Sequence, residues 1–106
     1  MLKPAIFNLK ESVEFAKDGI VSKTLIDIKE VKYVLFCFEK GQKLSKHTAP
    51  FAAGILVLEG KGKFLLGNKT YAGKEGSFFH MPPGLIHAVT AEENLVFLLS
   101  MVKSKT

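Results

Sequence analysis

The sequence has one cysteine, no tryptophan and no arginine, and each shortage narrows what the chain can do. A single cysteine, Cys37, excludes an internal disulfide and is typical of a reducing compartment, so we expect a cytoplasmic location. All fifteen basic residues are lysines, scattered among ten acidic residues to give a net charge of +5. Proteins that recognise specific nucleic-acid sequences favour arginine, and their basic residues usually cluster on one face. This chain has neither feature, so we expect no nucleic-acid partner.

Long apolar runs are also absent. The longest uncharged stretch, residues 76–91, is interrupted by Pro82, Pro83 and Gly84 and is shorter than the roughly 20 apolar residues of a membrane-spanning helix. Residues 1–10 are broken by two lysines and a proline, so they lack the apolar segment of a secretory signal. We therefore expect no association with a membrane.

What is present fits one folded domain over residues 1–106, with 47% apolar and 24% charged residues. Short apolar runs rich in β-branched and aromatic residues alternate with glycine-bearing turns, which is typical of an all-β fold. The expected strands are residues 20–28, 31–39, 54–59, 63–66, 69–71, 77–81, 87–91 and 95–102. Gly67 and Asn68 between two of these runs predict a two-residue hairpin turn with glycine first.

The N-terminal part of the chain differs from the rest. Residues 11–17 are the only segment that suggests a helical turn, with Ser12 as its cap and Gly19 as its stop. We expect residues 1–19 to form an arm that packs outside a barrel made by the remaining chain.

Two of the expected strands, residues 33–38 and 95–99, are apolar on both faces. A barrel strand that faces solvent should alternate between apolar and polar residues, so something must cover the outside of these two strands. Either another segment of the chain or a second subunit can provide this cover. A twofold partner would do so with one self-complementary patch, and we expect a homodimer.

Glycines and histidines recur at a spacing that resembles a known family. Gly41 is followed after five residues by His47, and Ala49, Ala53 and Gly60 follow at the intervals of a pattern that reads G-x5-H-x-H-x3-4-E-x6-G. This pattern is the first motif of the cupins. The chain matches its glycines and its first histidine, and has alanine where the second histidine and the glutamate stand.

A second stretch follows the other cupin motif, G-x5-P-x-G-x2-H-x3-N. Gly76, Pro82, Gly84 and His87 occupy its positions, with Ala91 in place of the final asparagine. Residues 20–102 therefore resemble a small single-domain cupin of the conserved-barrel, RmlC-like kind. The resemblance implies an antiparallel double-stranded β-helix, or jelly-roll barrel, with a site at its mouth.

The resemblance implies four metal-ligand positions, of which only His47 and His87 carry a ligand. Ala49 and Ala53 offer no lone pair. His80 is a third candidate: if it faces the interior, His47, His80 and His87 could hold one divalent transition metal, and three histidines are known to hold catalytic zinc. If it faces outward, the site is either a two-histidine set completed by water or ligand, or a pocket without metal.

Three functions are compatible with such a site. The small residues at 49 and 53 favour a binding barrel with a cavity for a small molecule. The residues expected to contact that ligand are His47, Ala49, Phe51, Ala53, Met81 and His87. The alternatives are a metal-dependent oxygenase or isomerase that uses the three histidines, and a metal-free enzyme in which His47 or His87 moves protons.

Overall fold

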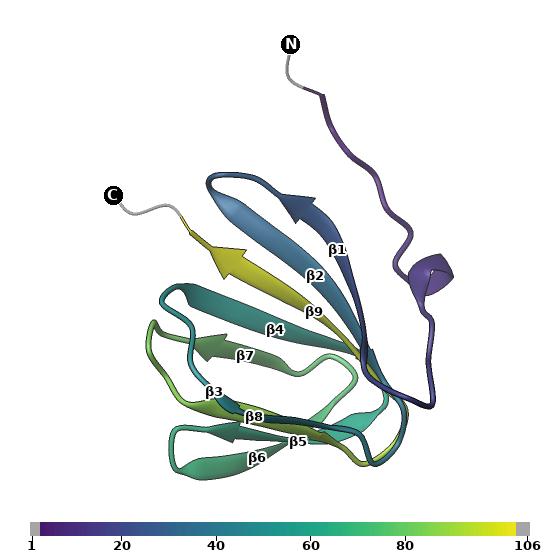
Figure 1. Ribbon diagram of the computed structural model, residues 1–106, viewed down its shortest axis with the longest axis vertical. Helices are drawn as coiled ribbons and strands as arrows, with labels where there is room; N and C mark the ends of the chain where they lie inside the picture. The colour runs from purple at the N-terminus through teal and green to yellow at the C-terminus, as the bar shows by residue number, and fades with distance from the viewer. Residues whose placement is uncertain (1–2, 104–106) are drawn as a thin grey trace.

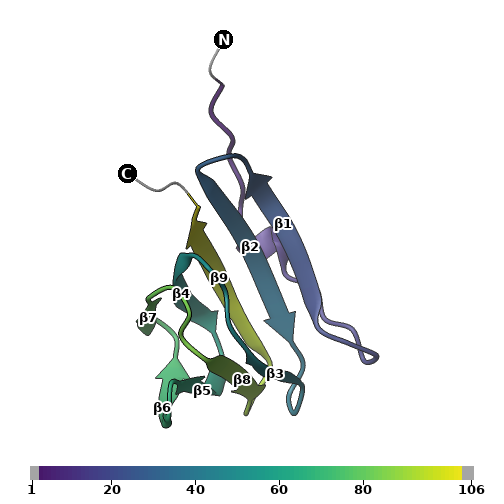
Figure 2. The ribbon, with the colours of Figure 1, turned by 60° about the vertical axis from the view of Figure 1, so that its left-hand side comes forward.

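The computed structural model describes residues 3–103, which form nine strands in two antiparallel sheets packed face to face (Figures 1 and 2). One sheet holds, in spatial order, β1 (Val21–Asp27), β2 (Val31–Phe38), β9 (Leu95–Val102), β4 (Ala52–Glu59) and β7 (Phe78–Met81). The other holds β3 (Lys43–His47), β8 (His87–Ala91), β5 (Lys61–Leu66) and β6 (Lys69–Lys74). The predicted all-β jelly-roll fold is confirmed. The ends of the predicted domain, residues 1–2 and 104–106, lie outside the described residues.

The turns follow the glycines. Gly67 has φ of +68° in the two-residue connection between β5 and β6, as the hairpin prediction requires. Gly60, between β4 and β5, has φ of +82°, and the carbonyl oxygen of Asn94 lies 1.9 Å from where a Cβ would be. Both the backbone conformation and the lack of space therefore require glycine at position 60.

The core between the sheets is aromatic. Phe38, Phe64 and Phe97 are almost completely buried, and the ring of Phe97 lies 5.5 Å from Phe38 and 5.9 Å from Phe64 between ring centroids. Burying each of these side chains contributes roughly 2–3 kcal/mol. Because the rings come from both sheets, this cluster holds the sandwich together.

The five-stranded sheet is also apolar on its outer face, the side that points away from the four-stranded sheet. Leu35, Cys37 and Val96 are fully buried in a second cluster there, beneath Val13 and Phe15 of the N-terminal segment. The chain itself thus covers part of the double-sided apolar strands. In Figure 1 this segment runs along the outside of β1 and β2.

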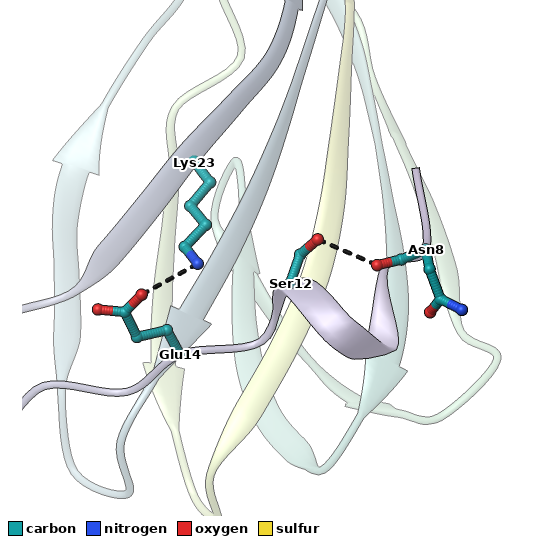
Figure 3. A network of polar contacts seen from close by, with 4 residues as sticks. All are labelled: Asn8, Ser12, Glu14 and Lys23. Atoms are coloured by element: carbon teal, nitrogen blue, oxygen red, sulfur yellow. Dashed lines mark hydrogen bonds and ion pairs between the residues drawn. The ribbon is translucent and has the colours of Figure 1, made fainter. Parts of the chain in front are cut away.

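The predicted helical turn over residues 11–17 is wrong. A short 3-10 helix spans Lys10–Ser12, with the Ser12 hydroxyl donating to the Asn8 carbonyl at 3.0 Å (Figure 3). Beyond it the segment is extended, because Val13 and Phe15, two residues apart, both reach the outer face of the sheet. An ion pair of 3.0 Å between Glu14 and Lys23 also links the segment to β1 (Figure 3).

Within residues 3–103 no helix has the length and apolar character needed to cross a membrane.

Candidate functional site

Two histidines meet at one end of the barrel, where β3 ends and β8 begins. His47 is the last residue of β3 and His87 is the first of β8, and the two are directly paired across the strands. A register shift after Leu44 brings them opposite each other. Their ring centroids lie 3.9 Å apart with an angle of 62° between the planes.

The turns around this pair are joined to each other. The amide of Gly84, in the turn before β8, donates a hydrogen bond of 2.8 Å to the carbonyl of Ala49, in the connection after β3. Gly84 has φ of +80°, a conformation that glycine adopts readily. The two motif turns thus fix the position of both histidines at the mouth of the barrel.

Each imidazole has one nitrogen bonded to the backbone. His47 Nδ1 lies 2.9 Å from the carbonyl oxygen of Ser45, and His87 Nδ1 lies 3.0 Å from that of Leu85. A carbonyl oxygen only accepts, so in both rings Nδ1 carries the proton and donates. In the neutral ring this leaves Nε2 as an acceptor, and the backbone has fixed the tautomer of both side chains.

His87 is the more buried member of the pair, with 9% of its surface exposed. Burial lowers the pKa of His87 below the usual 6.5, and the neighbouring His47 lowers it further, while the hydrogen bond to Leu85 acts in the opposite direction. His87 is therefore neutral at pH 7 and presents a lone pair on Nε2.

A cavity of about 100 Å³ lies beside the pair. Its lining includes all six residues that the sequence predicts as ligand contacts, namely His47, Ala49, Phe51, Ala53, Met81 and His87. Pro82 and Leu85 of the turn before β8 also line it. Sequence analysis missed the last two lining residues, Leu99 and Met101 of β9. Leu99 and Met101 alternate with the core residues Leu95 and Phe97 on β9. This pattern could have identified them as lining residues, but only if it had been known which of the two alternating sets faces the interior.

His80 does not join the pair. It is exposed on β7, where Phe79 and Met81 on either side pack into the core, so His80 points to the outer face of the five-stranded sheet. Alternation along the strand correctly places His80 on the same face as Phe78, which is also exposed. It does not tell whether this face or the opposite face, with Phe79 and Met81, is the interior one. The three-histidine set of His47, His80 and His87 is wrong for this reason.

The donor set at the mouth does not fit a tightly held metal. No group of three or more histidine, cysteine, aspartate or glutamate side chains is arranged to hold a metal within the described part of the chain. Ala49 and Ala53 line the cavity where the resemblance would place further ligands. Between residues 3 and 103 no buried side-chain nitrogen or oxygen lacks a partner, so no orphaned group calls for a metal.

Two facing antiparallel sheets with a pocket at one open end define a barrel of the jelly-roll class. Within that class the chain belongs to the cupin family: the model of the cupin domain matches residues 34–101, which include both histidines. No curated protein matches the chain.

Several solved structures are similar over most of the chain. A conserved protein of unknown function from Streptococcus pyogenes is 28% identical, with a TM-score of 0.86 over 100% of this chain and 93% of that one. An RmlC-like cupin protein from Desulfovibrio desulfuricans is 27% identical, with a TM-score of 0.88 over 95% and 98%. A cupin 2 conserved barrel domain protein from Leptotrichia buccalis is 40% identical over 92% of this chain, with a TM-score of 0.85, and this chain spans 47% of its length.

Proposed function

We propose that this cupin barrel binds a small organic molecule between the paired imidazoles and the apolar wall of the cavity. The observation that carries the proposal is the joint tautomer of His47 and His87, whose Nδ1 atoms are both occupied by backbone carbonyls. Both imidazoles line the cavity together with Phe51, Met81 and Leu99, and in the neutral ring of His87 the Nε2 atom is the remaining acceptor. A few placed polar groups in an otherwise apolar hollow are the usual form of a small-molecule site.

The chemistry of the lining selects the class of ligand. A cavity of about 100 Å³ is smaller than the roughly 150 Å³ that holds benzene in an engineered core, so the enclosed part of the ligand has few heavy atoms. Neutral imidazoles accept hydrogen bonds at Nε2, and a hydroxyl group donates one. A carboxylate only accepts, and would face the acceptor Nε2 of His87. The favoured ligand is therefore a small alcohol-like molecule with an apolar tail.

Two probes with the same tail test this preference. Butan-1-ol and butyrate are titrated against the protein while the imidazole NMR signals of its three histidines are followed. A ligand of about five heavy atoms binds in roughly the millimolar range. We expect butan-1-ol to shift the signals of His47 and His87 and leave that of His80 unchanged, with a much smaller effect of butyrate above pH 7.

Matched substitutions locate the binding. In His87→Ala the response to butan-1-ol should disappear, whereas His80→Ala, which changes a histidine on the outer face, should behave as the wild type. Absence of any shift at His47 and His87, or an equal response at all three histidines, contradicts the proposal.

A divalent transition metal held weakly by His47 and His87 is the second candidate. It is favoured by one feature, the Nδ1 hydrogen bonds to backbone carbonyls, because metal-ligating histidines almost always donate their other nitrogen in this way. Two imidazoles leave the remaining coordination positions to water or to the ligand. Metal analysis of untagged protein separates the candidates: bound metal near one per chain that is lost in His87→Ala would favour the metal site.

We also propose a cytoplasmic location. The support is the buried free thiol of Cys37, which packs among apolar side chains as a reduced residue. Fractionation of the source cells, followed by detection with a specific antibody, tests this proposal.

A further inference from the structure

The side chains that the cavity at the barrel mouth offers to a metal come from histidine and methionine. Of the described residues in its lining, four have a side chain with a lone pair to donate, and none of these is a carboxylate, a hydroxyl or an amide. They are the imidazoles of His47 and His87 and the thioethers of Met81 and Met101. Met1, the third methionine of the chain, lies outside the described residues. For a metal that accepts sulfur, the mouth therefore offers four donors rather than two.

The two thioethers are placed by one row of the five-stranded sheet. Ala53 on β4 is directly paired with Met81 on β7 and with Met101 on β9. Directly paired residues point to the same face, so the two methionines flank Ala53 on the interior side of the sheet. Met81 is 2% exposed and Met101 is half-buried. The methyl group of Ala53 fills little of the space between them, and the unbranched methionine side chain is flexible enough to turn its sulfur into that space.

The two imidazoles come from the other sheet. His47 and His87 are paired across β3 and β8, and each ring has its Nδ1 bonded to a backbone carbonyl. In a neutral ring only Nε2 is then left to bind a metal. Both rings and both thioethers line the same cavity of about 100 Å³, so donors from the two facing sheets border one small space.

The charge and the softness of these donors select the kind of metal. Imidazole and thioether are neutral ligands, so no side chain in the lining would offset the charge of a bound ion. The cost of taking an ion out of water grows with the square of its charge, which favours a monovalent ion over a divalent one. Hard ions prefer oxygen, whereas thioethers select Cu(I) and imidazole also suits copper.

We propose that the mouth of this barrel is a binding site for a monovalent copper ion, Cu(I). Its ligands are two imidazoles and two thioethers, those of His47, His87, Met81 and Met101. Neither methionine stands at a ligand position of the two sequence motifs, and a divalent metal would have the histidines alone. The site does not depend on the proposed alcohol. Butan-1-ol is titrated against metal-free protein, and a missing response there contradicts only the ligand proposal.

Competition with a chromogenic Cu(I) chelator, under nitrogen and with ascorbate present, measures the affinity. The wild type should bind about one Cu(I) per chain. Met81→Leu and Met101→Leu nearly conserve volume, and each should lower the Cu(I) affinity about tenfold or more. The affinity for zinc, whose usual ligands do not include thioethers, should stay within about a factor of two in both variants. His87→Ala should weaken the binding of both ions.

Cys37 requires a control, because a thiolate also binds Cu(I). Its side chain is fully buried on the outer face of the five-stranded sheet, so Cys37→Ala should leave the Cu(I) affinity within about a factor of two. X-ray absorption at the copper edge of this variant should detect both sulfur and nitrogen neighbours. Adding Met81→Leu and Met101→Leu should remove the sulfur. Circular dichroism checks folding, and should Met81→Leu misfold, Met101→Leu alone should still lose part of the sulfur signal.

Three outcomes overturn the proposal. One is a wild-type chain that binds no Cu(I) above background. Another is a folded Met81→Leu, Met101→Leu double variant that binds Cu(I) as tightly as the wild type, which would leave the imidazoles as the only ligands. The third is loss of Cu(I) in a folded Cys37→Ala protein, which would place the metal on the thiol.

Discussion

Replacing Ala53 with leucine should stabilise the protein and abolish ligand binding together. Ala53 is 6% exposed and lines the 100 Å³ cavity between Met81 and Met101, its partners on the neighbouring strands. Leucine adds three carbons, worth about 2.4 kcal/mol at roughly 0.8 kcal/mol each when buried. Fixing the leucine side chain costs roughly 0.5–1 kcal/mol, which leaves a gain of about 1.5 kcal/mol in the free energy of unfolding.

The gain is measured by urea unfolding, and it corresponds to an increase of roughly 6–12 °C in melting temperature for a domain of this size. The flexible side chains of Met81 and Met101 can move to accept the added carbons. The same filling should eliminate the response of His47 and His87 to butan-1-ol.

Ala52→Leu is the matched control, because Ala52 alternates with Ala53 and points to the outer face, so it should leave the response unchanged. A destabilised Ala53→Leu protein would show that the cavity is not free space. Unchanged binding would show that the ligand lies elsewhere.

Three further predictions concern the same elements. The free energy of unfolding should fall as pH decreases from about 7.5 through 6.5 toward 5.5, because His87 has a lower pKa in the folded state than in the unfolded state. Over this range the unfolded chain binds a proton at position 87 more readily than the folded chain does. Urea unfolding of His87→Gln should therefore show a shallower pH dependence. Gly60→Ala should cost about 3–4 kcal/mol, since it combines a strained positive φ with a clash against the Asn94 carbonyl, and a loss below about 1 kcal/mol in chemical denaturation would refute this. Ala49→His should raise zinc affinity at least tenfold over the wild type, because it places a third imidazole on the cavity wall that His47 also lines. A competition titration with a coloured chelator measures the affinity. An unchanged affinity would mean that a side chain at position 49 does not reach the histidine pair.

Alternation and turn residues were enough to predict most of the sheet, but they failed at β3. Its residues, Lys43–His47, include no β-branched residue and no phenylalanine, tyrosine or tryptophan, and only Leu44 packs against the core. β3 is an edge strand that pairs only with β8, and its lysines are exposed as expected at such an edge. A strand that buries one side chain leaves almost no periodic pattern in the sequence.

The candidate site was predictable because the spacing of the two motifs places His47 and His87 on paired strands. The orientation of His80 was not predictable. The run from Phe78 to Met81 offers a large apolar residue on each face, so local alternation is equally satisfied with either face inward. The choice is made by Phe79, whose ring stacks on Phe64 of the opposite sheet at 4.7 Å between ring centroids, and such a contact is not encoded locally.

Three strands of the five-stranded sheet contribute alternate residues to the cavity and to the outer face. On β4 and β9, Ala53 and Met101 line the cavity, while the adjacent Gly54 and Ser100 belong to the outer face. A single pleated layer of backbone therefore separates the cavity from the outer face. By thermodynamic linkage, anything that contacts the outer face and favours one arrangement of this layer changes the affinity of the cavity for its ligand, and the ligand changes that contact by the same factor. Such communication between the two faces would need no hinge and no moving domain, only a change in the pleat between them.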